Sequence, residues 1–161
     1  MHKSLNQELF IKYLETIGNC YVTGNFEPLF PYLAANCVWE SQWRLTPEEG
    51  KIAVENYYRK KGKALRESPT SLKYMIVQFI DNYNLTEMNV KVNKEEFKTA
   101  NVGLYYQSGK LALFLSQKYD DYNNATILDL TIDDGGMISR IDMCMPELFK
   151  FVKYEPYYSK K

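Results

Sequence analysis

Histidine is nearly absent from this 161-residue sequence. The only one is His2, beside a chain end that is expected to fray. Arrangements in which an imidazole activates a serine or cysteine nucleophile are therefore disfavoured, as are metal sites built on histidine ligands. Any catalysis has to rest on carboxylates, tyrosines or bound water. We predict no metal site, and the sequence assigns no catalytic residue.

Glycine-rich phosphate loops are missing as well. The 8 glycines form neither G-x-G-x-x-G nor G-x-x-x-x-G-K-[ST], the motifs in which a glycine-rich turn holds a phosphate group. The sequence thus offers no recognisable place for a nucleotide cofactor. We predict that the protein uses no cofactor.

Net charge and long apolar runs are also lacking. The chain has 20 basic and 20 acidic residues, which gives no overall field to attract nucleic acid or an anionic membrane. No apolar run approaches the roughly 18 residues of a membrane span, and the first residues lack the apolar core of a signal peptide. A basic run at 59–66 is typical of the solvated last turns of a helix. We expect neither a nucleic-acid nor a membrane partner.

Cysteine is scarce and oddly numbered. Cys20, Cys37 and Cys144 have no metal-ligand spacing, so they are interpreted as small buried apolar residues in a reducing compartment. We therefore predict a cytoplasmic protein. The length fits one domain covering residues 1–161.

Helical patterns dominate the first part of the chain. Ser4 and Gln7 have the form of a capping box, and apolar residues then recur every three or four positions up to Gly24. This predicts a helix at about 5–23. A second cap at Thr46, followed by proline and two glutamates, predicts a helix at about 47–63 that buries Ile52.

After residue 70 the pattern changes to short runs rich in Val, Ile, Tyr and Phe. Turn residues at 107–109 and 133–136 predict two hairpins, one joining 97–106 to 110–119 and one joining 124–132 to 137–145. Further strands are predicted at 72–81 and 88–92. Helices followed by an antiparallel meander indicate the α+β class.

Two segments carry a resemblance to a known superfamily. GNFEPLFPYLAANCVWESQW leads into TPEEGKIAVENYYRKKG, and the final hairpin reads DDGGMISRIDMCMP. This order resembles the NTF2-like, or SnoaL-like, superfamily over nearly the whole chain. The resemblance implies an α+β cone in which the helices pack in the concave face of one strongly curved, mostly antiparallel sheet. It also implies a pocket at the mouth of the cone and frequent pairing into homodimers.

Two tryptophans stand where such a pocket is expected. In a strand alternate side chains share a face, so Trp39, Ser41 and Trp43 lie together and Glu40 lies on the other face. With Tyr13 from the first helix and Tyr57 from the second, they predict an aromatic-lined pocket for a small hydrophobic or aromatic ligand. The alternative interpretation is that these aromatic side chains fill the core of the cone.

The resemblance includes ketosteroid isomerase, whose chemistry does not carry over. Aligning the turn at Gly24 places Ile17 where that enzyme has its oxyanion-hole tyrosine, and Ser41 where it has its catalytic aspartate. Asp129 falls close to its second aspartate, but the apolar alternation of the strand turns Asp129 to the outer face. A SnoaL-like mechanism would need Glu40 or Asp142 on the pocket side.

Three functions remain open at this stage. The first is binding of a small apolar or aromatic molecule, and the second is a SnoaL-like lyase or isomerase that uses a carboxylate and water. The third is a protein-interaction or purely structural dimer module. A homodimer is expected to form through the outer face of the sheet, which offers Asp129, Thr131, Arg140 and Asp142 among tyrosines.

Overall fold

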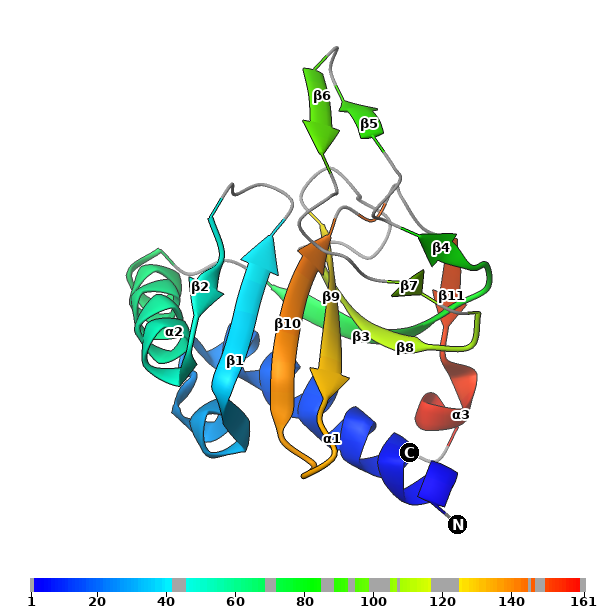
Figure 1. Cartoon of the computed structure of the whole chain (residues 1–161), viewed down its shortest axis with the longest axis horizontal. Coiled ribbons are helices and arrows are strands. Elements are labelled where there is room, and N and C mark those ends of the chain that lie inside the picture. The colour runs from blue at the N-terminus through cyan, green and yellow to red at the C-terminus, as the bar shows by residue number, and fades with distance from the viewer. Residues whose placement is uncertain are drawn as a thin grey trace.

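The computed structural model shows helices packed against one face of a curved sheet (Figure 1). The helical elements are α1 (His2–Thr23), the 3-10 helix η1 (Glu27–Tyr32), α2 (Lys51–Glu67) and the short α3 (Glu155–Tyr158). The structure describes residues 2–41, 46–68, 72–84, 89–92, 95–98, 105–106, 108–116, 125–144, 146 and 150–159. Trp43 lies outside these described residues.

Helix α1 confirms the predicted first helix. It presents a buried stripe to the sheet, and it ends at Gly24, whose φ of +74° is in the left-handed region that glycine tolerates. The Gly24 amide donates to the Cys20 carbonyl at 2.8 Å, which closes the last turn. The buried residues of the stripe are Tyr13, Leu14, Ile17, Cys20 and Tyr21.

The predicted start of the second helix at Thr46 is wrong. Glu48 and Glu49 form the short strand β2 (Glu48–Glu49), which pairs with Val38 and Trp39 of β1 (Leu33–Ser41), and α2 begins only after Gly50. The Gly50 amide donates to the Cys37 carbonyl, so the sheet edge satisfies backbone groups that a helical turn would have used. Ile52 is 76% exposed, because α2 packs through Val54, Tyr58 and Gly62 instead.

One seven-stranded sheet forms the body of the molecule, in the order β11-β3-β8-β9-β10-β1-β2. All its neighbours are antiparallel except β1 and β10, which run parallel, and the sheet stays open at both edges. This confirms the predicted fold class. The other strands of the sheet are β1 (Leu33–Ser41), β3 (Lys73–Phe79), β8 (Leu111–Ser116), β9 (Thr126–Ile132), β10 (Ile138–Cys144) and β11 (Phe151–Lys153).

Only one of the two predicted hairpins forms as expected. Strands β9 and β10 join through the turn at 133–136, where the Gly136 amide donates to the Asp133 carbonyl. The prediction of a hairpin joining 97–106 to 110–119 is wrong, since β8 pairs with β3 and β9 instead. The preceding strand β7 (Tyr105–Tyr106) pairs with β4 (Tyr83–Asn84), and β5 (Asn89–Val92) pairs with β6 (Glu95–Lys98).

Both faces of the central strands are buried. Leu128 and Leu130 lie in the helix-facing core, as the predicted alternation requires. Asp129, between them in sequence, is on the opposite face, yet its side chain is also buried. The outer face that was expected to mediate pairing thus has its carboxylates already covered within a single chain. In the part of the chain that the structure describes, no helix is long and apolar enough to cross a membrane.

Candidate functional site

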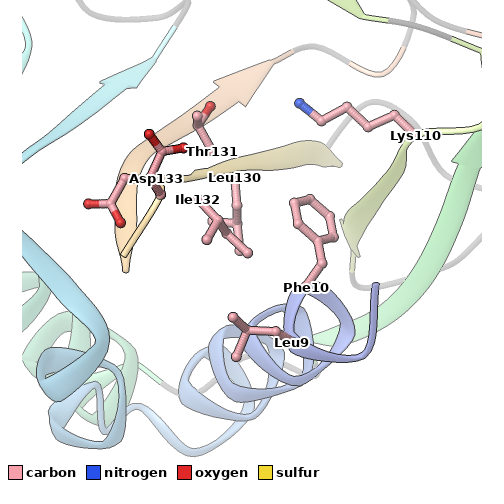
Figure 2. Close-up of a pocket in the computed structure, with 8 residues that line it drawn as sticks. Leu9, Phe10, Lys110, Leu130, Thr131, Ile132 and Asp133 are labelled. Carbon is pink, nitrogen blue, oxygen red and sulfur yellow. The ribbon is translucent and has the colours of Figure 1, made fainter. Parts of the chain in front are cut away.

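A pocket of about 430 Å³ lies where two central strands separate. Strands β8 and β9 are paired from Leu113–Leu128 to Leu115–Thr126. In the described part of these strands, Leu111 and Leu130 are not paired with each other. Helix α1 lies beneath the opening (Figure 2). We call this space the slot pocket. It is lined by Leu9, Phe10, Lys110, Leu130, Thr131, Ile132, Asp133 and Asp134.

The slot pocket has an apolar floor and a polar rim. Leu9 and Phe10 reach it from α1, and Leu130 and Ile132 reach it from β9 (Figure 2). The rim holds the ammonium group of Lys110, the hydroxyl of Thr131 and two turn carboxylates. Small-molecule sites commonly combine an apolar surface with a few fixed polar groups in this way.

Three hydrogen bonds fix the turn that closes one end of the slot pocket. The Asp133 carboxylate accepts hydrogen bonds from the Gly135 and Met137 amides, at 2.9 and 3.0 Å. The Tyr13 hydroxyl donates to the Gly136 carbonyl at 2.5 Å, which ties the turn to α1. Helix α1, which supplies part of the floor, and the turn at 133–136 are therefore held together by hydrogen bonds within the protein, without a ligand.

A row of three carboxylates crosses the outer face of the sheet beside the slot pocket. Glu40 on β1 pairs with Asp142 on β10, and Asp142 pairs with Asp129 on β9. We call Glu40, Asp142 and Asp129 the carboxylate row. Like charges directly opposite one another on neighbouring strands are unfavourable, so the row needs either cations or a bound proton.

Two cations partly neutralise the carboxylate row. Arg140 donates through Nη2 to Glu40 at 2.6 Å and through Nε to Asp142 at 3.1 Å. Lys110 donates to Asp129 Oδ2 at 2.7 Å. Since Lys110 also lines the slot pocket, this one ammonium group connects the pocket to the row.

The remaining excess of negative charge falls on Asp142. Burial is the main cause that raises the pKa of its carboxyl group to about 7; the carboxylates of Asp129 and Glu40 add to this rise, and Arg140 opposes it. Burial lowers the pKa of Arg140, but its two carboxylate partners outweigh this and the net shift is upward. The row therefore exchanges a proton close to neutral pH while keeping its guanidinium charged.

The described aromatic residues of the predicted site pack against other aromatic side chains of the protein. Trp39 is 2% exposed and stacks on Tyr57, with ring centroids 3.9 Å apart. Ser41 is half-buried at the end of β1, opposite Met143. Tyr13 instead contacts Tyr32, with ring centroids 5.0 Å apart, and borders the turn at 133–136. The structure thus brings Trp39 and Tyr57 together and gives Tyr13 different partners.

The sequence did not point to Lys110, and it indicated Thr131 only as part of an expected dimer face. A lysine directly after a turn glycine and a threonine in a strand are ordinary surface features, and no motif marks them. The separation of β8 from β9 that opens the slot pocket depends on pairing over long sequence distances. The one available signal was the odd placement of Asp129 among apolar neighbours.

Comparison with known proteins supports the fold. No family model and no curated protein matches the chain. A solved domain of unknown function with a cystatin-like fold, from Nostoc punctiforme PCC 73102, superposes with a TM-score of 0.51. That match has 9% identity over 96% of this chain and 83% of the other.

A second solved structure is similar. An uncharacterized bacterial protein with a cystatin-like fold, from Silicibacter pomeroyi DSS-3, gives a TM-score of 0.47 and 11% identity, covering 89% of this chain and 75% of the other. At such identities the likeness concerns the fold alone. The chain therefore has a cystatin-like α+β fold.

Proposed function

We propose that the protein binds a small molecule with an apolar body and one polar group in the slot pocket. The observation that carries this proposal is the position of the Lys110 ammonium group above an apolar floor, in a pocket of about 430 Å³. That volume lies within the usual range of small-molecule sites, roughly 300–1,000 Å³. The pocket walls are tied together by protein contacts, so binding costs little ordering of the site.

The lining also indicates what the ligand offers. The ring of Phe10 and the aliphatic side chains beside it favour a flat or compact apolar body. Lys110 and Thr131 are the donors on the rim, so the polar group is a hydrogen-bond acceptor such as a hydroxyl or carbonyl oxygen. Asp133 and Asp134 on the same rim disfavour a ligand with several negative charges.

A pair of tryptophan substitutions on α1 tests this proposal. Leu9→Trp fills the slot pocket from its floor, whereas Val22→Trp adds the same ring at a position of α1 that is 53% exposed. Titration with 1-naphthol, 2-naphthol and indole, followed by ligand-observed NMR, should show binding to the wild type. Leu9→Trp should weaken that binding at least about tenfold, a loss of about 1.4 kcal/mol. Binding that Val22→Trp weakens equally, or no binding to the wild type, would count against the slot pocket.

One observation also favours acid–base catalysis at the same place. Lys110 holds a proton at the pocket wall and is hydrogen-bonded to Asp129, the direct neighbour of a carboxyl group that exchanges its proton near pH 7. Such a chain of proton-holding groups suits a lyase or isomerase that moves a proton next to a carbonyl. In this second candidate function Lys110 donates its proton to the carbonyl oxygen of the substrate while solvent water takes the α-proton, and Asp129 positions the Lys110 ammonium group.

Substituting Lys110 with arginine separates catalysis from binding. Arginine keeps the positive charge beside Asp129 but is a weaker proton donor than lysine. Wild-type protein should accelerate exchange of the α-protons of 2-tetralone with deuterium oxide, measured by NMR. Lys110→Arg should reduce that acceleration by about a hundredfold, as loss of general acid–base catalysis typically does, while retaining ligand binding. Equal exchange rates in both proteins would rule out the catalytic role.

A further inference from the structure

A second pocket lies near the C-terminal end of α1, between η1 and α2. It has a volume of about 570 Å³ and is separate in its lining residues from the slot pocket. We call it the cationic groove. Its lining residues are Asn25, Phe26, Glu27, Phe30, Tyr58, Arg59, Lys63 and Arg66.

Aromatic rings form the floor of the cationic groove. Phe26 stacks on Tyr58 with ring centroids 4.7 Å apart, and both side chains are buried. Phe30 lies four residues after Phe26, and the Arg59 guanidinium sits over its ring at 4.8 Å from the centroid. The floor is therefore both apolar and rigid, because each ring is held by a neighbour on another element.

Three cations from one face of α2 form a wall of the groove. Arg59, Lys63 and Arg66 are spaced by four and three residues, which places them on the same side of a helix. Among the lining residues they are opposed by the single carboxylate of Glu27. The groove thus presents an excess of positive charge in a chain whose formal net charge is zero.

The present partners of these three cations are weak or neutral, so the cations can still bind an anion. Arg59 lies 3.6 Å from Glu27 and 3.7 Å from Glu55, and its side chain is half exposed. Exposed ion pairs of this kind contribute little, so a bound anion can replace them. Arg66 donates to the Gly24 carbonyl, a neutral acceptor that fixes the guanidinium without cancelling its charge. Lys63 has only a loose pairing with Glu67, at 3.9 Å.

We propose that the cationic groove binds a small aromatic anion, either a carboxylate or a phosphate monoester. The ligand ring lies above this buried floor, at the edge of Phe30 and against the aliphatic parts of the Arg59 and Lys63 side chains. The anionic group accepts charge-assisted hydrogen bonds from Arg59 and Lys63. Guanidinium and ammonium groups on one helix face suit both anions, since each presents oxygens that accept several donors. This site shares no lining residue with the slot pocket, and its ligand is an anion rather than a neutral molecule.

Titration of the full chain with matched small molecules tests the groove. Phenyl phosphate and benzoate are the two anionic probes, benzyl alcohol is the neutral aromatic control, and inorganic phosphate is the control without a ring. Amide NMR shifts should move at residues 25–30 and 58–66 with at least one aromatic anion. Whichever of the two binds more tightly identifies the anionic group. Saturable binding of benzyl alcohol or inorganic phosphate with equal affinity would overturn the proposal.

Three substitutions by glutamine on α2 test whether the anion binds in the groove. Lys63→Gln removes a groove cation, whereas Lys60→Gln removes an exposed cation of the same helix that does not line the groove. Lys63→Gln and Arg59→Gln should each weaken the preferred anion by about tenfold, and Lys60→Gln should leave its affinity within about twofold. An equal loss in Lys60→Gln would show attraction by the overall charge of the helix, and would refute a built site.

Discussion

Replacing Asp142 with asparagine should stabilise the protein at neutral and alkaline pH. The pKa of this carboxyl group is raised from 3.8 to about 7 in the folded chain. Between those two values the folded protein holds a proton that the unfolded chain has released, so the free energy of unfolding falls as the pH rises. This decrease in the free energy of unfolding is complete above the pKa of Asp142 in the folded protein. Asparagine removes this dependence because it is neutral at every pH.

The expected gain follows from the same linkage. It should be absent below about pH 4, grow between pH 4 and pH 7, and level off above that. Each unit between the two pKa values is worth about 1.4 kcal/mol, but Asp142→Asn also deprives the half-buried Arg140 of a carboxylate partner. We therefore expect a net gain of about 1–2 kcal/mol at pH 8, measured by urea unfolding at pH 4, 6 and 8.

Asp134→Asn is the matched control for this measurement. Asp134 is an exposed residue of the turn that follows β9, so the same chemical change there should leave the pH profile unaltered. If Asp142→Asn lowered the free energy of unfolding at pH 8, the pairing of ionised Asp142 with Arg140 would outweigh its burial. The row would then act as a plain structural ion pair.

The sequence predicted the elements that depend on local pattern. The apolar stripe of α1 and its stop at Gly24 follow from spacing and from one residue type, and both are present. The hairpin at 133–136 also forms, because an aspartate and two glycines fix the turn within four residues. In each case the information lies within a few neighbouring positions.

Failures occurred where distant segments competed with local preference. Thr46 followed by proline is a good helix start, but pairing of Glu48 and Glu49 with β1 overrides it. Gly109 favours a hairpin, yet its amide donates to the Phe79 carbonyl. The turn is therefore hydrogen-bonded to the end of β3 and does not join the two predicted strands. Local propensity amounts to fractions of a kcal/mol per residue, so strand pairing and burial readily outweigh it.

The carboxylate row could not have been predicted from alternation alone. Alternation correctly placed Asp129 away from the helices, but it carries no information on whether that face is covered. The row also requires the register of three strands, one of them parallel, to align Glu40 with Asp142 and Asp129. The parallel pairing joins segments about 100 positions apart, as the separation of Glu40 and Arg140 shows. No local signal encodes it.

Replacing Gly62 with alanine should destabilise the protein, although glycine is a poor helix former. In an exposed helix the change normally stabilises by about 1 kcal/mol. Here a β-carbon at position 62 would lie 2.6 Å from the Gly24 carbonyl oxygen and 3.3 Å from the Phe26 ring. The first of these atoms belongs to the backbone at the end of α1, so no side-chain rotation relieves the clash.

The two helices must therefore move apart if Gly62 is substituted. Overpacking of this kind typically costs about 1–3 kcal/mol, and we expect Gly62→Ala to lower the free energy of unfolding by that amount in urea titrations. Lys60→Ala, at an exposed position of the same helix, should change it by less than about 0.5 kcal/mol. Because Phe26 and Arg66 both lie within 3.5 Å of the added carbon, Gly62→Ala should also weaken binding in the cationic groove. Unchanged or increased stability would mean that α1 and α2 are not locked together at this contact, and that the groove has a deformable rather than a fixed floor.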